Sequence, residues 1–192
     1  MKFTLLVALL IIAAPASASV GHRADPKALV LQLSDLPNGF GRDSGRYVTN
    51  AQLDAERTTH KDFRKLGRLS GYYTSYSAIA VGGVTEVSSF ASIYKLGTGA
   101  HASLVQSLSQ AEGEGGLELI PAAGLSRLGT DARLFRQRAS QNGTAVDFYT
   151  VVWRDGTVFA EVMGAGRAGT VDPDQVVALA KKQATRIARL TS

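Results

Sequence analysis

Residues 158–180, VFAEVMGAGRAGTVDPDQVVALA, set an apolar segment almost directly before the start of a helix. Residues 157–163 are rich in β-branched and aromatic side chains, which is typical of a strand. Asp172 is a suitable N-cap, Pro173 fits the first helical position, and Gln175 at N3 resembles a capping box. The stretch therefore predicts a strand, a glycine-rich connection and a C-terminal helix.

The glycines of this stretch, Gly164, Gly166 and Gly169, also spell G-x-G-x-x-G. A dinucleotide site needs that motif to open its helix directly and to be followed, about 20 residues later, by an acidic residue that binds the ribose. Here the predicted helix begins only at Pro173, and the residue 20 positions beyond Gly169 is Arg189. We therefore predict no nucleotide cofactor and interpret the glycines as a flexible strand-to-helix connection.

The same reasoning applied outward predicts strands grouped in hairpins rather than alternating with helices. The predicted strands are residues 68–80, 84–95, 132–139, 144–154 and 157–163, and the predicted helices are residues 26–36, 51–67, 98–112 and 173 onward. Gly82-Gly83, Asn142-Gly143 and Asp155-Gly156 supply turns. The glycine-rich residues 39–46 are predicted to be a loop. This order favours a single α+β domain with an antiparallel sheet of about five strands and helices packed on one face. Trp153 is expected to lie in the core against the last helix.

Residues 1–18, MKFTLLVALLIIAAPASA, have the features of a secretory signal peptide. Lys2 precedes an apolar core, and Ala16 and Ala18 form a small-x-small cleavage site. We expect cleavage near Ala18 and an exported protein, periplasmic or extracellular, with residues 19–192 as one domain and no later transmembrane segment. Since the chain has no cysteine, its stability must come from a packed core.

Catalytic and metal-binding motifs are weak in this sequence. His22, His60 and His101 stand apart and form no two-ligand helix motif. Ser70 lies in G-x-x-S-G, which is not the G-x-S-x-G nucleophile elbow. The strand carboxylates are interpreted as solvated: Asp131, Asp147, Asp155 and Glu161. We expect no catalytic residue, no metal and no cofactor; an enzyme of unfamiliar type is the minor alternative, and it would require convergent acid and base groups.

Tyrosines of the first predicted hairpin suggest a ligand site. Alternation places Tyr72 and Tyr76 on one sheet face, and a ring with a polar tip suits a half-open groove. With Tyr94 and Arg154 they are the candidate contacts of a non-enzymatic module that binds a small ligand or an envelope protein in a groove beside the sheet. The hypothesis requires at least one exposed tyrosine in a concave site; ordinary sheet packing is the alternative.

Basic residues of the second predicted helix suggest a different function. If that helix is continuous, Arg57, Lys61, Arg64 and Lys65 share one face. Such a face binds an anionic polymer or a membrane surface through counterion release. The alternative is an ordinary solvated helix face, in keeping with the modest net charge of +5. Nothing in the sequence indicates sequence-specific nucleic-acid binding.

Three segments together resemble known exported proteins. They are LSDLPNGF at residues 33–40, TVVWRDGTVFAEVMGAG at residues 150–166 and LAKKQATRI at residues 179–187. The chain resembles a broad group of small, uncharacterised exported bacterial proteins with an L-x-x-x-D-L-P-x-G opening. More distantly, it is similar to the extracellular sensor domains of mycobacterial serine/threonine kinases. The resemblance implies an α+β fold with a groove and no catalytic site, and it transfers no functional residue.

Overall fold

The computed structural model describes residues 24–56, 62–79, 82–113 and 117–192, so the predicted signal peptide lies outside the described residues. The elements in the described residues are, in chain order, α1 (Pro26–Leu29), the 3-10 helix η1 (Leu33–Asp35), β1 (Phe40–Tyr47), α2 (Asn50–Glu56), β2 (Arg68–Ala78), β3 (Glu86–Tyr94), α3 (Gly97–Gly113), β4 (Leu117–Leu119), the 3-10 helix η2 (Leu125–Arg127), β5 (Thr130–Gln141), β6 (Thr144–Asp155), β7 (Val158–Arg167) and α4 (Pro173–Thr191).

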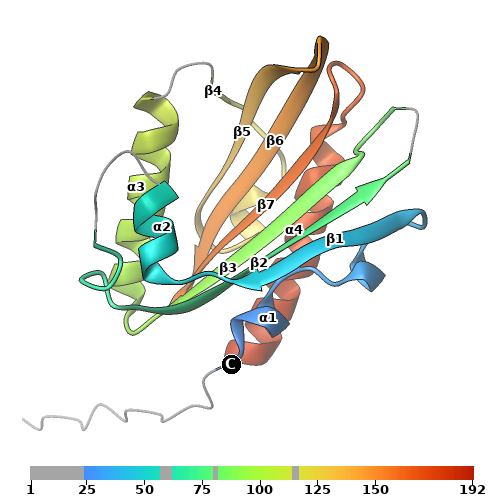
Figure 1. Ribbon diagram of the computed structural model, residues 1–192. Helices are drawn as coiled ribbons and strands as arrows, with labels where there is room; N and C mark the ends of the chain where they lie inside the picture. Colours follow the sequence, from blue (N-terminus) through green and yellow to red (C-terminus); the bar gives the residue numbers. More distant parts are fainter. Residues whose placement is uncertain (1–23, 57–61, 80–81, 114–116) are drawn as a thin grey trace, which may run out of the picture.

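The strands form one antiparallel sheet in the order β1-β2-β3-β7-β6-β5-β4 (Figure 1). Two meanders, β1-β2-β3 and β4-β5-β6-β7, meet where β3 pairs with β7. The α+β class and the hairpin construction predicted from the sequence are confirmed. The predicted number of about five strands is wrong, because the described residues contain seven.

The two strands missing from the prediction lie at the edges of the sheet. In β1, every residue after Phe40 is exposed, so the strand lacks the alternation of apolar and polar residues that marks a half-buried strand. It is held by backbone pairing with β2, and the charges of Arg42, Asp43 and Arg46 suit a solvent-facing edge. Strand β4 has only three residues, which is too short to show a period.

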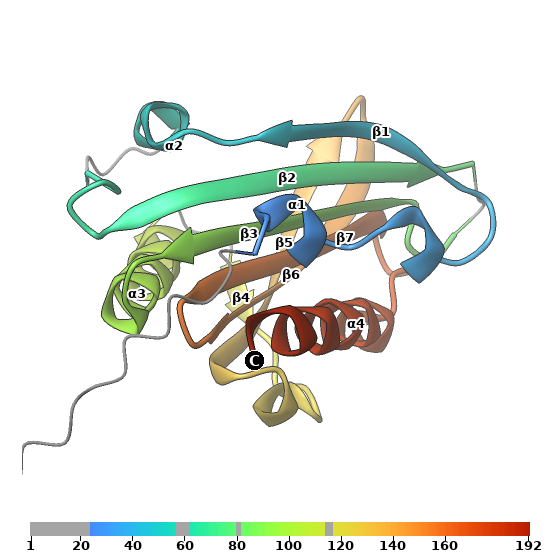
Figure 2. The same ribbon diagram turned by 90° about the horizontal axis from the view of Figure 1, so that it is seen from below.

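Helices cover both faces of the sheet, which corrects the prediction that they pack on one face (Figure 2). Strand β6 is an example: Trp153 packs against α4 on one face, and the preceding residue, Val152, packs against α3 on the other face. The residues of this strand that face α4 and those that face α3 are thus both apolar, as expected of a strand buried on two sides. We call the two surfaces the α4 face and the α3 face.

The glycines of the opening stretch serve close packing. Gly164 and Gly166 lie inside β7, and only Gly169 belongs to the connection, so the interpretation of all three as a flexible loop is wrong. A Cβ at Gly164 would lie 2.7 Å from a methyl group of Val176 in α4, and one at Gly166 would collide with the carbonyl oxygen of Gly83. The absent side chains therefore let α4 and the β2–β3 turn approach the sheet.

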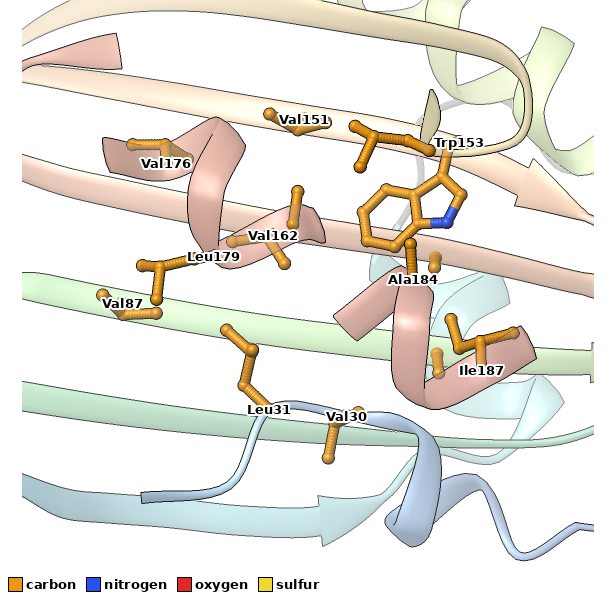
Figure 3. Close-up of a cluster of buried hydrophobic side chains, with 14 of the residues drawn as sticks. Val30, Leu31, Val87, Val151, Trp153, Val162, Val176, Leu179, Ala184 and Ile187 are labelled. Carbon is orange, nitrogen blue, oxygen red and sulfur yellow. The ribbon is translucent and has the colours of Figure 1, made fainter. Parts of the chain in front are cut away.

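Helix α4 begins where the sequence predicts. The Asp172 side chain accepts a hydrogen bond from the backbone of Asp174, and Pro173 occupies the first turn. Trp153 is fully buried and lies against Ala184 and Ile187 of α4, so its expected core position is confirmed (Figure 3).

A buried hydrogen-bond chain joins the first segment of the protein to the α4 face. The first helix ends at Leu29 and not at residue 36 as predicted, and Leu31 lies in the segment that follows it. The backbone N–H of Leu31 donates to Ser89 Oγ at 3.0 Å, Ser89 donates to Gln183 Oε1 at 2.6 Å, and Gln183 Nε2 donates to the Phe90 carbonyl. These polar groups are therefore paired with one another away from solvent.

Candidate functional site

The three candidate tyrosines are core residues. Tyr72 and Tyr76 share the α4 face as predicted, but they are only 4% and 2% exposed, and Tyr94 is 2% exposed on the α3 face. The Tyr76 hydroxyl donates to the Leu31 carbonyl at 2.7 Å, and the Tyr72 hydroxyl accepts from Arg42 at 2.7 Å. The sheet separates Tyr94 from the other two, so these residues do not form the predicted groove, and the exposed tyrosine that the hypothesis requires is absent from this set.

The fourth candidate, Arg154, lies near the start of α3. Its guanidinium is 3.6 Å from Asp131 Oδ2, and His101 Nδ1 approaches the same oxygen at 3.3 Å. Asp131 has a φ of 63° at a bulge where β5 pairs with β6, a conformation that few residues other than glycine adopt. No role for His101 was predicted from the sequence, because its partner Asp131 is 30 residues away and is brought close only by the fold.

This cluster has part of the arrangement of a catalytic site, a histidine oriented by a carboxylate. Such a site also needs a nucleophile within hydrogen-bond reach of the other ring nitrogen. Among the described residues no hydroxyl hydrogen-bonds to His101. The contacts of Asp131 with His101 and Arg154 join α3 to β5 and β6.

The predicted basic helix does not extend to Gly67. Helix α2 ends at Glu56, and residues 63–67 form turns. Arg57 and Lys61 lie outside the described residues. Arg64 and Lys65 are exposed, and Lys65 lies 3.7 Å from Asp62. The continuous helix face that would bring the four cations together is thus interrupted, and binding of an anionic polymer by these residues stays a prediction.

Among the carboxylates of the described residues, Asp147 has the pKa that lies furthest from its usual value. It is 1% exposed and accepts hydrogen bonds from Arg138 at 2.7 and 3.0 Å, from Arg136 at 3.3 Å and from the backbone of Gly169 at 2.8 Å. The hydrogen bond from Arg138 is the largest cause that lowers the pKa of Asp147 far below its usual value. The interpretation of this residue as solvated is wrong; it ties the β5–β6 hairpin to the connection before α4.

The α3 face contains a half-open strip beyond the helix. Helix α3 covers Val152 and Phe159, but the next positions along the same strands are only partly covered. Cross-strand pairs align Ser75 with Ser88, Ser88 with Met163, and Met163 with Thr150, so these side chains share one face. With Phe148, the partly exposed members form what we call the α3-side strip: Ser75, Phe148, Thr150 and Met163, with the buried Ser88 between Ser75 and Met163.

The strip leads to a hollow of about 400 Å³ at the end of the sheet remote from α3. Glu86, which lines the hollow, and Phe148 of the strip both pair with Ala165, so the two features adjoin. Arg167 supplies a cation opposite in sign to Glu86, and Thr144 supplies a hydroxyl. The strip and hollow together offer apolar surface, hydroxyl groups and one charge of each sign.

Sequence reasoning missed this site although one signal was present. Residues 144–154 are largely apolar or aromatic in both registers, which indicates cover on both faces. The pattern does not reveal where the covering helix ends, and that position decides which residues remain accessible.

Neither a metal-binding cluster nor a membrane-spanning helix occurs in the part of the chain that the structure describes. Those residues contain no group of three or more histidine, cysteine or acidic side chains placed to hold a metal. None of the described helices is long and apolar enough to cross a membrane.

Comparisons with known proteins give one distant similarity. No protein-family model and no curated protein matches the sequence. Among solved structures, the chain is similar to the crystal structure of the extracellular domain of PknH from Mycobacterium tuberculosis, at 10% identity, a TM-score of 0.49 and coverage of 83% of this chain and 94% of that one. A likeness at this level identifies neither a ligand nor a binding residue.

Proposed function

We propose that the protein is an exported, non-enzymatic binding module that holds a small ligand on the α3-side strip and in the adjoining hollow. The observation that carries the proposal is the half-burial of Phe148, Thr150 and Met163 beside a hollow of about 400 Å³. Partly accessible apolar side chains with a few polar groups around them are the usual lining of a ligand site. The groove of the original hypothesis is kept, but its contacts move from the tyrosines to this strip.

The lining suggests the chemistry of the ligand. Phe148 and Met163 supply an apolar surface, and the hydroxyls of Ser75 and Thr150 accept or donate hydrogen bonds. Because Glu86 and Arg167 contribute one charge each, a neutral or zwitterionic molecule suits the hollow better than a strongly charged one.

Native mass spectrometry of the protein isolated from the envelope of the cell that makes it tests the proposal. We expect a reproducible excess mass of small-molecule size. A larger assembly would point to a protein partner, and a bare monomer would contradict a tightly held small ligand.

A blocking variant tests the location. Thr144→Trp places a large ring in the hollow from an exposed position, so the excess mass should disappear. Ser140→Trp is the matched control, because Ser140 is exposed on the neighbouring strand and alternation directs it to the other face. Loss of the ligand from both variants, or from neither, would contradict binding in the hollow.

A further inference from the structure

The longer edge of the sheet is open in the part of the chain that the structure describes. Strand β1 pairs with β2 on one side, and none of the described strands pairs with it on the other (Figure 2). Every residue after Phe40 is exposed, and the ring of Tyr47 at the end of the strand is 54% exposed. An edge of this kind presents a row of backbone groups to which a further strand can be added.

The pairing with β2 indicates which backbone groups point outward. The N–H of Val48, directly after the strand, donates to the Gly71 carbonyl of β2. Since the backbone groups of successive residues point to opposite sides of a strand, those of Tyr47 and Gly45 point away from β2. Near the middle of the edge, Gly45 therefore offers an N–H and a carbonyl for pairing with another strand.

On the α3 face, β1 carries one acidic and one basic side chain. Asp43 accepts a 2.7 Å hydrogen bond from Ser77, and the Arg46 guanidinium carbon lies 5.5 Å from the centre of the Tyr73 ring. By alternation Ser77 and Tyr73 share this face with Ser75 of the strip. In a regular strand, residues 43 and 46 would lie on opposite faces. The bulge of β1 against β2 brings them to the same face.

On the α4 face, β1 carries Arg42 and Tyr47. The Arg42 guanidinium donates to the Tyr72 hydroxyl at 2.7 Å, and the Tyr47 ring packs edge-on against the Tyr72 ring, with centroids 5.0 Å apart. Each face of the strand thus holds two groups that attract each other when they lie opposite one another. These are a carboxylate and a guanidinium on one face, and a guanidinium and an aromatic ring on the other.

We propose that β1 pairs antiparallel with β1 of a second copy, about a two-fold axis at Gly45, so that one continuous sheet runs through a symmetric dimer. On the α3 face, this pairing places Asp43 of each copy across from Arg46 of the other. On the α4 face, with the bulged residue passed over, it places Arg42 of each copy across from Tyr47 of the other. Because a two-fold interface repeats every contact, both kinds of pair occur twice.

The charges of β1 select this arrangement over other pairings of the same edge. Parallel pairing in register would place each charge beside the same charge of the second copy, which is destabilising. In the free chain the same charges keep the edge hydrated. The interface consists of one strand from each copy, and a contact of this size and polarity favours a weak dimer that exchanges with monomer.

Sedimentation equilibrium of the purified protein from about 5 μM to about 500 μM tests the proposal, because weak interfaces dissociate in that range. We expect a reversible equilibrium between monomer and dimer without larger species, since the two-fold pairing occupies the β1 edge of both copies. Larger, open-ended assemblies would overturn the proposal. A monomer at every concentration would also overturn it, and would leave the edge to solvent or to a strand of a different protein.

Charge-reversal variants locate the interface. Arg46→Asp sets like charges against each other at two symmetric positions, so the dissociation constant of the dimer should rise by about tenfold. Asp43→Arg should have the same effect. The double variant Asp43→Arg with Arg46→Asp should restore dimerisation, because the exchanged charges attract each other again. Loss of folding stability alone would not be rescued in this way, so a double variant no better than the single ones would refute the pairing.

Glu118→Arg in β4 is the matched control. It changes the net charge as much as Asp43→Arg does, but at a 62% exposed side chain on the opposite edge of the sheet. The dissociation constant should stay within about twofold of that of the unaltered protein. An effect equal to that of Asp43→Arg would contradict pairing through β1. Since no residue of β1 lines the proposed ligand site, the dimer and the ligand site can fail separately.

Discussion

Strand β6 presents two unlike surfaces from one sequence. Towards α4 it places Val151 and Trp153, both fully buried. Towards α3 it places Val152 under the helix but leaves Phe148 and Thr150 half-buried. The difference arises from the helices: α4 lies along its face and contacts β6 and β7, whereas α3 contacts the same strands near Val152 and Phe159.

Two serines, Ser89 and Ser75, illustrate the same division. On the α4 face Ser89 is 1% exposed and bonded to Leu31 and Gln183, within the core. On the α3 face Ser75 shares a 2.7 Å hydrogen bond with Ser44 at an exposed site. A serine that is part of the core on one face is thus part of an accessible surface on the other. The position of the covering helix, rather than residue type, separates structural residues from candidate contacts.

The largest expected effect contrasts two aromatic residues of β6. Trp153→Ala should lower the free energy of unfolding by about 3–5 kcal/mol, because it opens a cavity in a fully buried cluster. Phe148→Ala should cost less than about half as much, since the ring is already partly in contact with water. Urea denaturation of both variants measures the difference. Equal losses would mean that the α3 face is as closed as the α4 face.

A smaller effect is expected where β7 meets the β2–β3 turn. Gly166→Ala directs a methyl group at the Gly83 carbonyl oxygen, and relieving that overlap should cost about 2–3 kcal/mol. Gly41→Ala in β1 is the control: a Cβ there meets nothing within 4 Å, so the change should be neutral or slightly stabilising. Thermal unfolding of the two variants compares a closed junction with an open edge. If Gly166→Ala were also neutral, close approach would not be the reason for this glycine.

The sequence predicts those parts of the fold that local chemistry determines. Asp172 and Pro173 specify the start of α4, and the Asn142-Gly143 and Asp155-Gly156 turns specify the last two hairpins, since these residues act through their own backbone. Strand β1 could not be predicted in this way, because its edge position is set by pairing with β2 and leaves no apolar pattern.

The candidate site was harder to predict than the fold. Alternation correctly put Tyr72 and Tyr76 on one face, but it cannot tell a face that is covered from one that is open. The cover comes from α1 and α4, which are distant in sequence from β2. The ion pairs of Asp147 and Asp131 likewise join residues that only the sheet register brings together.

The hydrogen-bonded serines test the comparison more finely. Ser89→Ala removes the acceptor of Leu31 N–H and the donor to Gln183, both buried, and should cost about 1–2 kcal/mol. Ser75→Ala breaks an exposed bond that water can replace, and it should cost about 0.5 kcal/mol or less. Denaturant midpoints of the two variants check this ranking. A larger loss for Ser75→Ala would reverse the assignment of the closed and open faces.

The smallest effect concerns the ion pair of Asp147 with Arg138 and depends on pH. The hydrogen bond from Arg138 holds the pKa of Asp147 below the unfolded value of about 4. A carboxyl whose pKa is lowered by folding stabilises the protein above the unfolded pKa, and this contribution disappears as the pH falls through the folded pKa. Asp147→Asn should therefore cost about 1 kcal/mol at pH 7, because the amide oxygen still accepts hydrogen bonds and the main charge partner, Arg138, is itself 53% exposed and screened by solvent. The difference from the unaltered protein should shrink steadily below about pH 4.

Arg138→Gln supplies the matched comparison for that measurement. It leaves the buried carboxylate in place but removes its main hydrogen-bond donor, so it should reproduce most of the loss at pH 7 and most of the convergence in acid. Unfolding curves recorded from pH 7 down to about pH 2 follow both variants. If the difference in the free energy of unfolding between each variant and the unaltered protein stays constant over this range, Asp147 stabilises the protein by shape and hydrogen bonding alone. A difference that disappears shows that its charge holds the β5–β6 hairpin to the connection before α4, and that acid would loosen this end of the sheet first.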